Sequence, residues 1–346
     1  MSERTKILVI QTAFPGDALL TLPFIQELKK QLSEAYIDVL CVPSTTEIFR
    51  ASPYINSVIA LDKRGEQKGF VNFLQFVKKL KKNKYQTIYS PHRSFRSSLI
   101  TLQLSAKKSI GFENSSLPIV FNKLIPYDYS AHEVERNLNL LEKNFSNNKW
   151  KIIPELNVPD NLKMNVKTFL DNNSITKFIS IAPGSVWETK KYPAYHFKEI
   201  INHFNNSGYQ VVLVGGEQDR NLCESLALTY DANVFVSAGK FSFIETIELM
   251  KKSALLICND SAPTHLGVCA QIPVLTIFCS TSPKFGFYPY NSGSDYISYD
   301  DLVCKPCGIH GYQTCPLDHF NCGHLLSPDN VISKAKILLQ NVDGTR

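Results

Sequence analysis

Residues 6–22 read KILVIQTAFPGDALLTL and contain the pattern that decides the fold. The apolar run Lys6–Ile10 predicts a buried strand, Phe14-Pro15-Gly16 predicts a tight turn, and helical spacing follows from Asp17 to about residue 32. The same order of apolar run, glycine turn and helix recurs at residues 177–206, beginning KFISIAPGSVWETKKYP. Two such starts predict two α/β domains, each built on a parallel sheet.

Short apolar runs alternate with amphipathic stretches along all 346 residues, a length typical of two domains. Breaker residues within 150–173 place the boundary, giving a first domain at 1–160 and a second at 161–326, and we expect a helix in 327–346 to pack back on the first domain. The other predicted strands are 36–41, 57–61, 86–89, 210–214, 233–236, 254–258 and 273–278. The other predicted helices are 67–82, 132–145, 193–206, 217–230, 243–252 and 263–270. Ligands of such folds bind beyond the carboxyl ends of the strands, so we expect the active site in a cleft between the domains.

Composition excludes several classes of protein. Hydrophobic residues make up 44% and charged residues 20%, as in ordinary globular chains. No apolar run approaches the roughly 18 to 20 residues that span a bilayer, and the first residues lack the long apolar region of a signal peptide. We therefore expect a cytoplasmic protein whose nine cysteines are not a disulfide framework.

Positive charge is concentrated in the first half. Between Lys63 and Lys108 there are twelve Lys or Arg residues and the single acid Glu66, so this segment carries +11, whereas the whole chain carries only +6. The asymmetry indicates an anionic partner such as a phosphate-bearing lipid, a nucleic acid or a charged sugar. A solvated helix face is the simpler alternative.

Fingerprints of common nucleotide-binding proteins are missing. There is no Gly-x-x-x-x-Gly-Lys-Ser/Thr motif, and no Gly-x-Gly-x-x-Gly follows the first strand, which argues against kinases and dehydrogenases. Instead, Asp17 follows a glycine turn at a helix start, where it either caps the helix or presents a carboxylate to a cleft.

Two segments of the second half carry polar groups at predicted strand ends. Residues 184–191 combine a glycine turn, a hydroxyl and a lysine pair before a helix, which suits a diphosphate, although a solvent-exposed loop is the alternative. In residues 259–267, Asp260, Ser261 and His265 follow a core strand and surround a helix start. A lone histidine in a helix is more often structural, but these neighbours favour a functional one.

Together these segments resemble glycosyltransferase family 9, the ADP-heptose:lipopolysaccharide heptosyltransferases, and within it most closely the heptosyltransferase II group. The resemblance runs along nearly the whole chain and is strongest in PGDALLTLP at 15–23, KKYP at 190–193, GGE at 215–217 and NDSAPTH at 259–265. It implies the GT-B architecture, two Rossmann-like domains that face each other across a central cleft. It also implies heptose transfer with inversion at the anomeric centre and without a metal or cofactor.

The resemblance assigns roles to particular positions. Asp17 falls on the catalytic base, and Lys190 on the lysine that stabilises the departing ADP. Contacts to the donor fall on Ser185, Val186, Glu217, Phe241, Asp260, Ser261, Ala262 and His265. The sequence departs from the commonest family pattern at two of these, since Val186 replaces a frequent hydroxyl residue and Ala262 a frequent glycine. Neither change removes a charged group, so we expect the same class of donor, while its fine specificity is open.

The implied acceptor is an anionic lipopolysaccharide precursor, Kdo-lipid A or heptosyl-Kdo-lipid A, at the cytoplasmic face of the inner membrane. Arg93 and Arg96 are its predicted contacts, because arginine binds carboxylate and phosphate in a bidentate manner. The basic segment would attach the protein peripherally to this surface. A family relative that uses another nucleotide sugar and a non-catalytic polyanion-binding protein are the alternatives. A nucleic-acid partner is not expected, since it would leave Asp17, Lys190 and His265 unexplained.

Four cysteines in a short stretch have no role in sugar transfer. Cys304, Cys307, Cys315 and Cys322 include one Cys-x-x-Cys pair, with histidines between them. A structural zinc site, free thiols packed in a loop and a redox switch are all compatible with this spacing.

Overall fold

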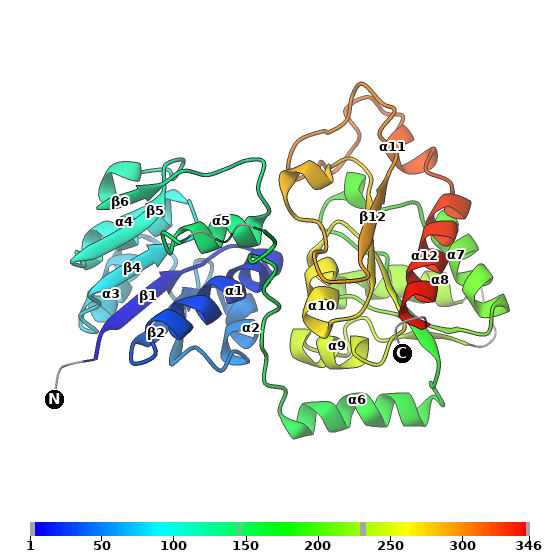
Figure 1. The fold of residues 1–346 in the computed structure, drawn as a ribbon, viewed down its shortest axis with the longest axis horizontal. Helices are drawn as coiled ribbons and strands as arrows, with labels where there is room; N and C mark the ends of the chain where they lie inside the picture. Colours follow the sequence, from blue (N-terminus) through cyan, green and yellow to red (C-terminus); the bar gives the residue numbers. More distant parts are fainter. Residues whose placement is uncertain (1–3, 144, 146, 229–232, 344–346) are drawn as a thin grey trace. The chain divides into compact units, whose positions relative to one another are not determined.

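The protein divides into two compact units in a computed structural model that describes residues 4–143, 145, 147–228 and 233–343 (Figure 1). The first unit ends at Asn157 and the second begins at Val158, close to the expected boundary at 160. Each unit has its own sheet of six parallel strands, as two repeats of the opening pattern predict.

The first sheet has the order β3-β2-β1-β4-β5-β6. Its strands are β1 (Lys6–Ile10), β2 (Tyr36–Cys41), β3 (Ser57–Ala60), β4 (Thr87–Ser90), β5 (Lys108–Phe112) and β6 (Lys123–Ile125). Its helices are α1 (Pro15–Gln31), α2 (Thr46–Arg50), α3 (Phe70–Lys81), α4 (Phe95–Leu104) and α5 (Glu133–Asn139), with the 3-10 turns η1 (Pro43–Thr45) and η2 (Pro118–Val120). The chain moves outward from β1 in both directions, so the strand order reverses between β1 and β4.

The second sheet repeats this plan with the order β12-β11-β10-β7-β8-β9. Its strands are β7 (Phe178–Ala182), β8 (Gln210–Leu213), β9 (Val234–Val236), β10 (Leu256–Asn259), β11 (Val274–Phe278) and β12 (Asp295–Ser298). Its helices are α6 (Asp160–Asn172), α7 (Ala194–Asn206), α8 (Arg220–Ala227), α9 (Phe243–Met250), α10 (Ala262–Ala270), α11 (Asn321–His324) and α12 (Pro328–Asp343), with η3 (Glu188–Lys190), η4 (Glu217–Asp219) and η5 (Pro283–Phe285). Here the order reverses between β7 and β10.

Side-chain spacing explains why these elements form. The central strands are apolar on both faces, since Ile7, Leu8, Val9 and Ile10 are fully buried, as parallel strands covered by helices require. Helix α3 is amphipathic instead, with Phe73, Val77 and Leu80 buried at helical spacing and lysines outside. Pro15 begins α1 at a position where its missing N–H costs nothing.

The last helix departs from the prediction. We expected it to pack on the first domain, but α12 packs on α7, β11 and β12 (Figure 1). Val331, Ala335 and Leu338 are buried in the core of the second unit. The three positions lie on one helix face, and the second sheet offers the apolar surface that covers it. The second unit therefore extends through α12.

Other differences concern element ends and elements that were not predicted. The helix expected at 132–145 ends at Asn139, and Glu142 is left-handed with φ 57°. Residues 144, 229 and 230, in the predicted helices 132–145 and 217–230, lie outside the described residues. Helix α4 and the strands β5, β6 and β12 were not predicted; β6 and β12 are short, and β5 contains Gly111. Among the described residues, no helix has the length and apolar character needed to cross a membrane.

Candidate active site

In the first unit, polar residues gather beyond β1 and β4, where the strand order reverses. Asp17 stands in the first turn of α1, and its Oδ2 accepts a hydrogen bond from the Phe14 N–H at 3.2 Å. The residue is nevertheless partly exposed. Asp17 can therefore both cap α1 and present a carboxylate to a ligand, the two roles between which the sequence did not decide.

The pKa of Asp17 is raised to about 6. Burial of the carboxyl group is the largest cause, and the carboxylate of Glu133 adds to it. The N–H groups of Phe14 and Asp17 and the guanidinium of Arg93 act in the opposite direction. A carboxyl group with this pKa is mostly ionised at pH 7 and still basic enough to accept a proton from a hydroxyl group in a transition state.

The two predicted acceptor arginines follow β4, but their surroundings differ. The Arg93 guanidinium carbon lies 4.0 Å from the centre of the Tyr127 ring, and its charge acts on Asp17. Arg96 is exposed, and its guanidinium carbon lies 5.7 Å from the Phe73 ring of α3. The structure thus brings Arg93 together with Asp17 and leaves Arg96 on the surface beside α3.

Lys63 and His92 also lie at this strand end, although neither was singled out in the sequence. The Lys63 Nζ donates to the carbonyl oxygen of Thr12 at 2.9 Å and to its Oγ1 at 3.0 Å. The Thr12 Oγ1 also lies 2.9 Å from Nδ1 of His92. Burial, and then the charge of Arg96, lower the pKa of Lys63. Only the place of Lys63 in the basic segment signalled it.

In the second unit, the corresponding strand end holds a buried ion pair. The Nζ of Lys190 lies 2.7 Å from Oδ2 of Asp260, and the two side chains are only 13% and 9% exposed. Lys190 ends η3 after β7, whereas Asp260 directly follows β10. The Thr281 hydroxyl donates to the same oxygen of Asp260 at 2.7 Å. Residues far apart in the sequence therefore fix the lysine ammonium group at one point.

The loop after β7 is tied to β10 by Asn259, which was part of a quoted motif but received no role. Its Nδ2 donates to the Pro183 carbonyl at 2.7 Å, and its Oδ1 accepts from the Tyr192 N–H at 3.0 Å. Gly184 leaves no room for a side chain, because a Cβ there would lie 2.1 Å from Oδ1 of Asp219. The glycine thus allows close packing of the loop.

Helix α10 begins beside the ion pair. Ser261 precedes its first residue, Ala262, so the positive end of the helix dipole lies directly after β10. His265 is buried in α10, and its Nδ1 has no hydrogen-bond partner within the part of the chain that the structure describes. Burial, and then the charge of Lys190, lower its pKa to about 3. The imidazole is therefore neutral at pH 7.

Two predicted nucleoside contacts lie beyond other strands. Glu217 follows β8, and its Oε2 accepts from Arg220 Nη2 at 2.6 Å. A Cβ on Gly239, which follows β9, would lie 2.2 Å from this oxygen. Phe241 is partly exposed and packs edge-on against Phe169, with ring centres 5.3 Å apart. No contact joins Phe241 to the Lys190–Asp260 pair among the interactions of the described residues.

Ser185 and Val186 lie in the loop after Gly184. The Ser185 Oγ accepts a hydrogen bond from the Trp187 N–H at 3.4 Å, and the side chain of Val186 is exposed. The Val186 carbonyl accepts from Nε2 of Gln313 at 3.1 Å. These backbone contacts keep the loop in place but give the Val186 side chain no partner of its own.

The cysteine-rich segment forms a loop of the second unit. All nine cysteines are free thiols, and Cys304, Cys307 and Cys315 line a pocket of about 380 Å³. Sγ of Cys304 lies 3.9 Å from Nε2 of His319. Over the described residues, no group of three or more His, Cys, Asp or Glu side chains is arranged to hold a metal ion.

The two units therefore offer complementary chemistry. The first presents a carboxylate beside arginine, which suits proton transfer from an anionic acceptor. The second presents an ammonium group and a helix N-terminus, which suit a diphosphate. Doubly wound sheets commonly bind nucleotide ligands at such reversals of strand order.

Two parallel sheets with such groups at their strand ends fit a glycosyltransferase of the GT-B class, and the comparisons with known proteins agree. Residues 73–314 match the family described as Glycosyltransferase family 9 (heptosyltransferase), and the chain belongs to this family. It is 24% identical over 341 residues to lipooligosaccharide heptosyltransferase 2 of Campylobacter jejuni, covering 97% of this chain and 99% of the relative.

Two solved structures share the fold. A family 9 glycosyl transferase from Veillonella parvula has a TM-score of 0.85 at 22% identity, covering 99% of both chains. The ADP-heptose lps heptosyltransferase II of E. coli has a TM-score of 0.79 at 20% identity, covering 98% of this chain and all of that one. The predicted family, fold class and enzyme class are confirmed, whereas the roles of single residues stay predictions.

Proposed function

We propose that the protein transfers heptose from ADP-L-glycero-D-manno-heptose to the inner core of a lipopolysaccharide precursor, with inversion and without a metal. The observation that carries the proposal is Asp17, a carboxylate at the reversal of the first sheet with a pKa of about 6. The names of the relatives support the sugar and the acceptor class, since they describe lipooligosaccharide and lipopolysaccharide heptosyltransferases.

In the proposed reaction, Asp17 takes the proton of an acceptor hydroxyl as its oxygen attacks the anomeric carbon. The new bond forms on the face opposite the departing ADP, which inverts the centre. Lys190 and the N-terminus of α10 stabilise the charge that develops on the diphosphate. Asp260 holds Lys190 in place, and Glu217 and Phe241 contact the nucleoside. Every role in the proposed reaction is assigned to a side chain or a helix end of one of the two units.

The acceptor is an anionic lipid, so the proposal includes peripheral contact with the cytoplasmic face of the inner membrane. The surface formed by the first turns of α3 and α4 supports it. Phe70, Val71 and Phe95 are exposed there, with Phe70 73% accessible. The exposed basic residues of the basic segment are Arg64, Lys68, Lys78, Lys79, Lys81, Lys82, Lys84, Arg96, Lys107 and Lys108. Apolar side chains among bases suit an anionic lipid surface.

Nucleotide binding tests the donor first. Melting of the purified protein is followed with ADP, ADP-heptose and UDP-sugars, because a ligand that binds the folded state raises its stability. We expect the largest shift with ADP-heptose and a much smaller one for Lys190→Ala. A preference for uridine nucleotides would indicate a relative that uses another sugar, and no shift with any nucleotide would favour a non-catalytic polyanion-binding protein.

Transfer to Kdo-lipid A and to heptosyl-Kdo-lipid A, followed by mass spectrometry, then tests the acceptor. A product heavier by one heptose on either lipid supports the proposal and shows which heptose is added. Binding of ADP-heptose without product on either lipid would contradict the proposed acceptor while keeping the donor.

A further inference from the structure

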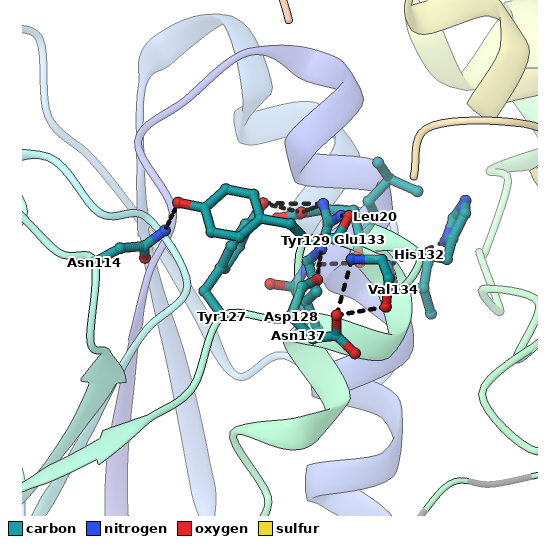
Figure 2. Close-up of polar contacts among 11 residues, drawn as sticks. Leu20, Asn114, Tyr127, Asp128, Tyr129, His132, Glu133, Val134 and Asn137 are labelled. Carbon is teal, nitrogen blue, oxygen red and sulfur yellow. Dashed lines mark hydrogen bonds and ion pairs between the residues drawn. The ribbon is translucent and has the colours of Figure 1, made fainter. Parts of the chain in front are cut away.

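A buried polar cluster lies beside Asp17 and has no role in the reaction described above. Glu133 and Arg136 form an ion pair of 2.9 Å with side chains 9% and 2% exposed. The Tyr127 hydroxyl donates to the same Glu133 oxygen at 2.7 Å and accepts from Arg136 Nη1 at 3.0 Å (Figure 2). A buried charged group costs free energy unless it is paired and hydrogen-bonded. Each of these three side chains satisfies the others, so moving any one of them would leave a buried polar group without a partner, and the arrangement is therefore rigid.

Arg136 also ties the loop that carries Tyr127 to helix α5. Its Nε donates to the Asp128 carbonyl at 2.7 Å, and its Nη2 donates to the Tyr129 carbonyl at 2.9 Å. The next residue of α5, Asn137, donates from its side-chain amide to the Leu20 carbonyl of α1 at 3.2 Å (Figure 2). Helix α1 carries Asp17 in its first turn, so the cluster is fixed relative to the proposed base.

The Tyr127 ring supports Arg93. The Arg93 guanidinium carbon lies 4.0 Å from the centre of the ring, and its main-chain carbonyl is held by the N–H and hydroxyl of Ser116 at 2.9 and 3.0 Å. Across the described residues, Arg93 forms no ion pair. Its hydrogen-bond donors therefore stay available to a ligand while the ring limits where the side chain can point.

We infer that Tyr127 is a positioning residue for the acceptor: its ring, locked by Glu133 and Arg136, holds the Arg93 guanidinium beside Asp17 to receive a carboxylate or phosphate of the acceptor. The inference rests on the proposed function. The uncharged Tyr127 ring orients the Arg93 guanidinium, and the Glu133–Arg136 pair that holds the ring carries no net charge. The positive charge of Arg93 is therefore available to the ligand. Glu133 has a second effect, since its charge contributes to the raised pKa of Asp17.

The test compares Tyr127→Leu with the wild type in steady-state transfer and in binding of Kdo-lipid A or heptosyl-Kdo-lipid A in detergent micelles without donor. Loss of the ring should raise the acceptor KM and Kd by about 2- to 30-fold, the factor that corresponds to one cation–π contact. The KM for ADP-heptose should not change. Because Arg93 lowers the pKa of Asp17, its release should also move the acid limb of kcat/KM to higher pH.

Two further variants separate positioning from general damage. Tyr127→Phe keeps the ring under Arg93 but loses the hydroxyl that Glu133 and Arg136 hold, so its acceptor affinity should lie between those of the wild type and Tyr127→Leu. Tyr36→Leu is the matched control, because Tyr36 also supports an arginine, Arg4, at 5.4 Å from its ring centre but belongs to the start of β2. It should leave the acceptor KM unchanged.

A double-variant cycle decides whether Tyr127 acts through Arg93. In an Arg93→Ala background, Tyr127→Leu should have little further effect on acceptor binding. The inference would be overturned if Tyr127→Leu weakened acceptor binding as much in the Arg93→Ala background as in the wild type. It would also be overturned if Tyr127→Leu lost as much affinity for the donor as for the acceptor, or if its acceptor Kd were unchanged. If Tyr127→Leu does not fold, Arg93→Ala with Tyr127→Phe still decides it, since equal losses from both variants would show that the ring is not the support. A wild type that binds the lipid but transfers nothing would instead contradict the proposed function.

Discussion

At the residue scale, burial shifts two groups in opposite directions. It raises the pKa of the Asp17 carboxyl to about 6 and lowers that of the His265 imidazole to about 3, because in each case it disfavours the charged form. The shift of Asp17 suits a base that must be ionised yet reactive at neutral pH. The shift of His265 removes it as an acid at that pH and leaves it as a neutral hydrogen-bonding group.

Asp17→Asn should therefore separate activity from stability. Transfer should fall by about 10² to 10⁴, the usual contribution of a general base. The folded pKa of Asp17 lies above its unfolded value of 3.8, so its ionisation destabilises the fold as pH rises through 6, and the neutral variant should melt no lower than the wild type at pH 8. Steady-state kinetics and melting curves at pH 8 measure both.

The acid limb of the wild-type kcat/KM should lie near pH 6, where Asp17 becomes protonated. Below it, the rate should fall about tenfold per pH unit. Unchanged turnover in Asp17→Asn would remove Asp17 as the base, and a variant that melts far below the wild type would show that the loss comes from unfolding.

The Lys190–Asp260 pair gives a second prediction for single residues. Asp260→Ala leaves a buried ammonium group without its partner, and breaking a buried pair costs about 3 to 5 kcal/mol. Asp171→Ala, which breaks the exposed Lys167–Asp171 pair of α6, should cost no more than about 1 kcal/mol. Chemical denaturation of both variants measures the difference. Equal losses would mean that the site pair is as dispensable as a surface one.

At the element scale, α3 is more than a basic helix. Its buried face packs into the first unit, while Phe70 and Val71 are exposed in its first turn, and Phe95 is exposed at the start of α4, which packs against α3. Apolar side chains that are exposed together within a basic segment mark a surface that a membrane or another partner can cover. The sequence predicted the charge of this segment, but only the fold shows which apolar residues share its surface.

Vesicle binding tests this surface. The double variant Phe70→Ser/Val71→Ser should weaken binding to vesicles containing phosphatidylglycerol by about tenfold or more, because buried apolar area is lost. Ile337→Ser, at another exposed apolar site, on α12, is the control and should bind as the wild type does. Co-sedimentation at two salt concentrations separates the apolar contribution to binding from the electrostatic one, because salt screens only the latter. Equal binding of the two variants would argue against insertion of α3.

At the scale of the whole molecule, the two units should respond differently to acid. The folded pKa of His92 is about 4 and that of His265 about 3, both below the unfolded value of 6.5, so the stability they contribute is present above pH 6.5 and is lost as pH falls through this range. In the first unit, protonation of Asp17 below pH 6 acts in the opposite direction. In the second unit, burial raises the pKa of Asp219, which acts in the same direction as Asp17, but this residue lies in η4 and not in β10 or α10.

Hydrogen exchange of the intact chain at pH 7 and pH 5 should therefore show a larger loss of protection around β10 and α10 than around β1 and α1. In His265→Gln, the pH dependence of exchange in β10 should become flatter, whatever its stability at pH 7. An equal loss of protection in both units would contradict the proposed compensation of His92 by Asp17 in the first unit.

Much of the fold could be predicted because the signals are local. The strands beginning at Lys6 and Phe178, the turn before Asp17 and the helix that follows depend on apolar spacing and on breaker residues within a few positions. Short or polar strands such as β5, β6 and β12 escaped, because their pairing partners rather than their own residues make them strands. The predicted place of α12 was wrong for a related reason. An apolar helix face indicates that the helix is covered, but it does not indicate which other element covers it.

The sequence by itself determined the two α/β units, the family motifs, the basic segment and the candidates Asp17, Lys190 and Asp260. Only the tertiary structure showed that Lys190 and Asp260 form one buried pair, that Asn259 fastens the neighbouring loop, and that Tyr127 lies under Arg93 beside a buried Glu133–Arg136 pair. The physical reason is that a charge and a spacing are properties of the chain, whereas burial and the partner of a charge arise when distant segments pack together.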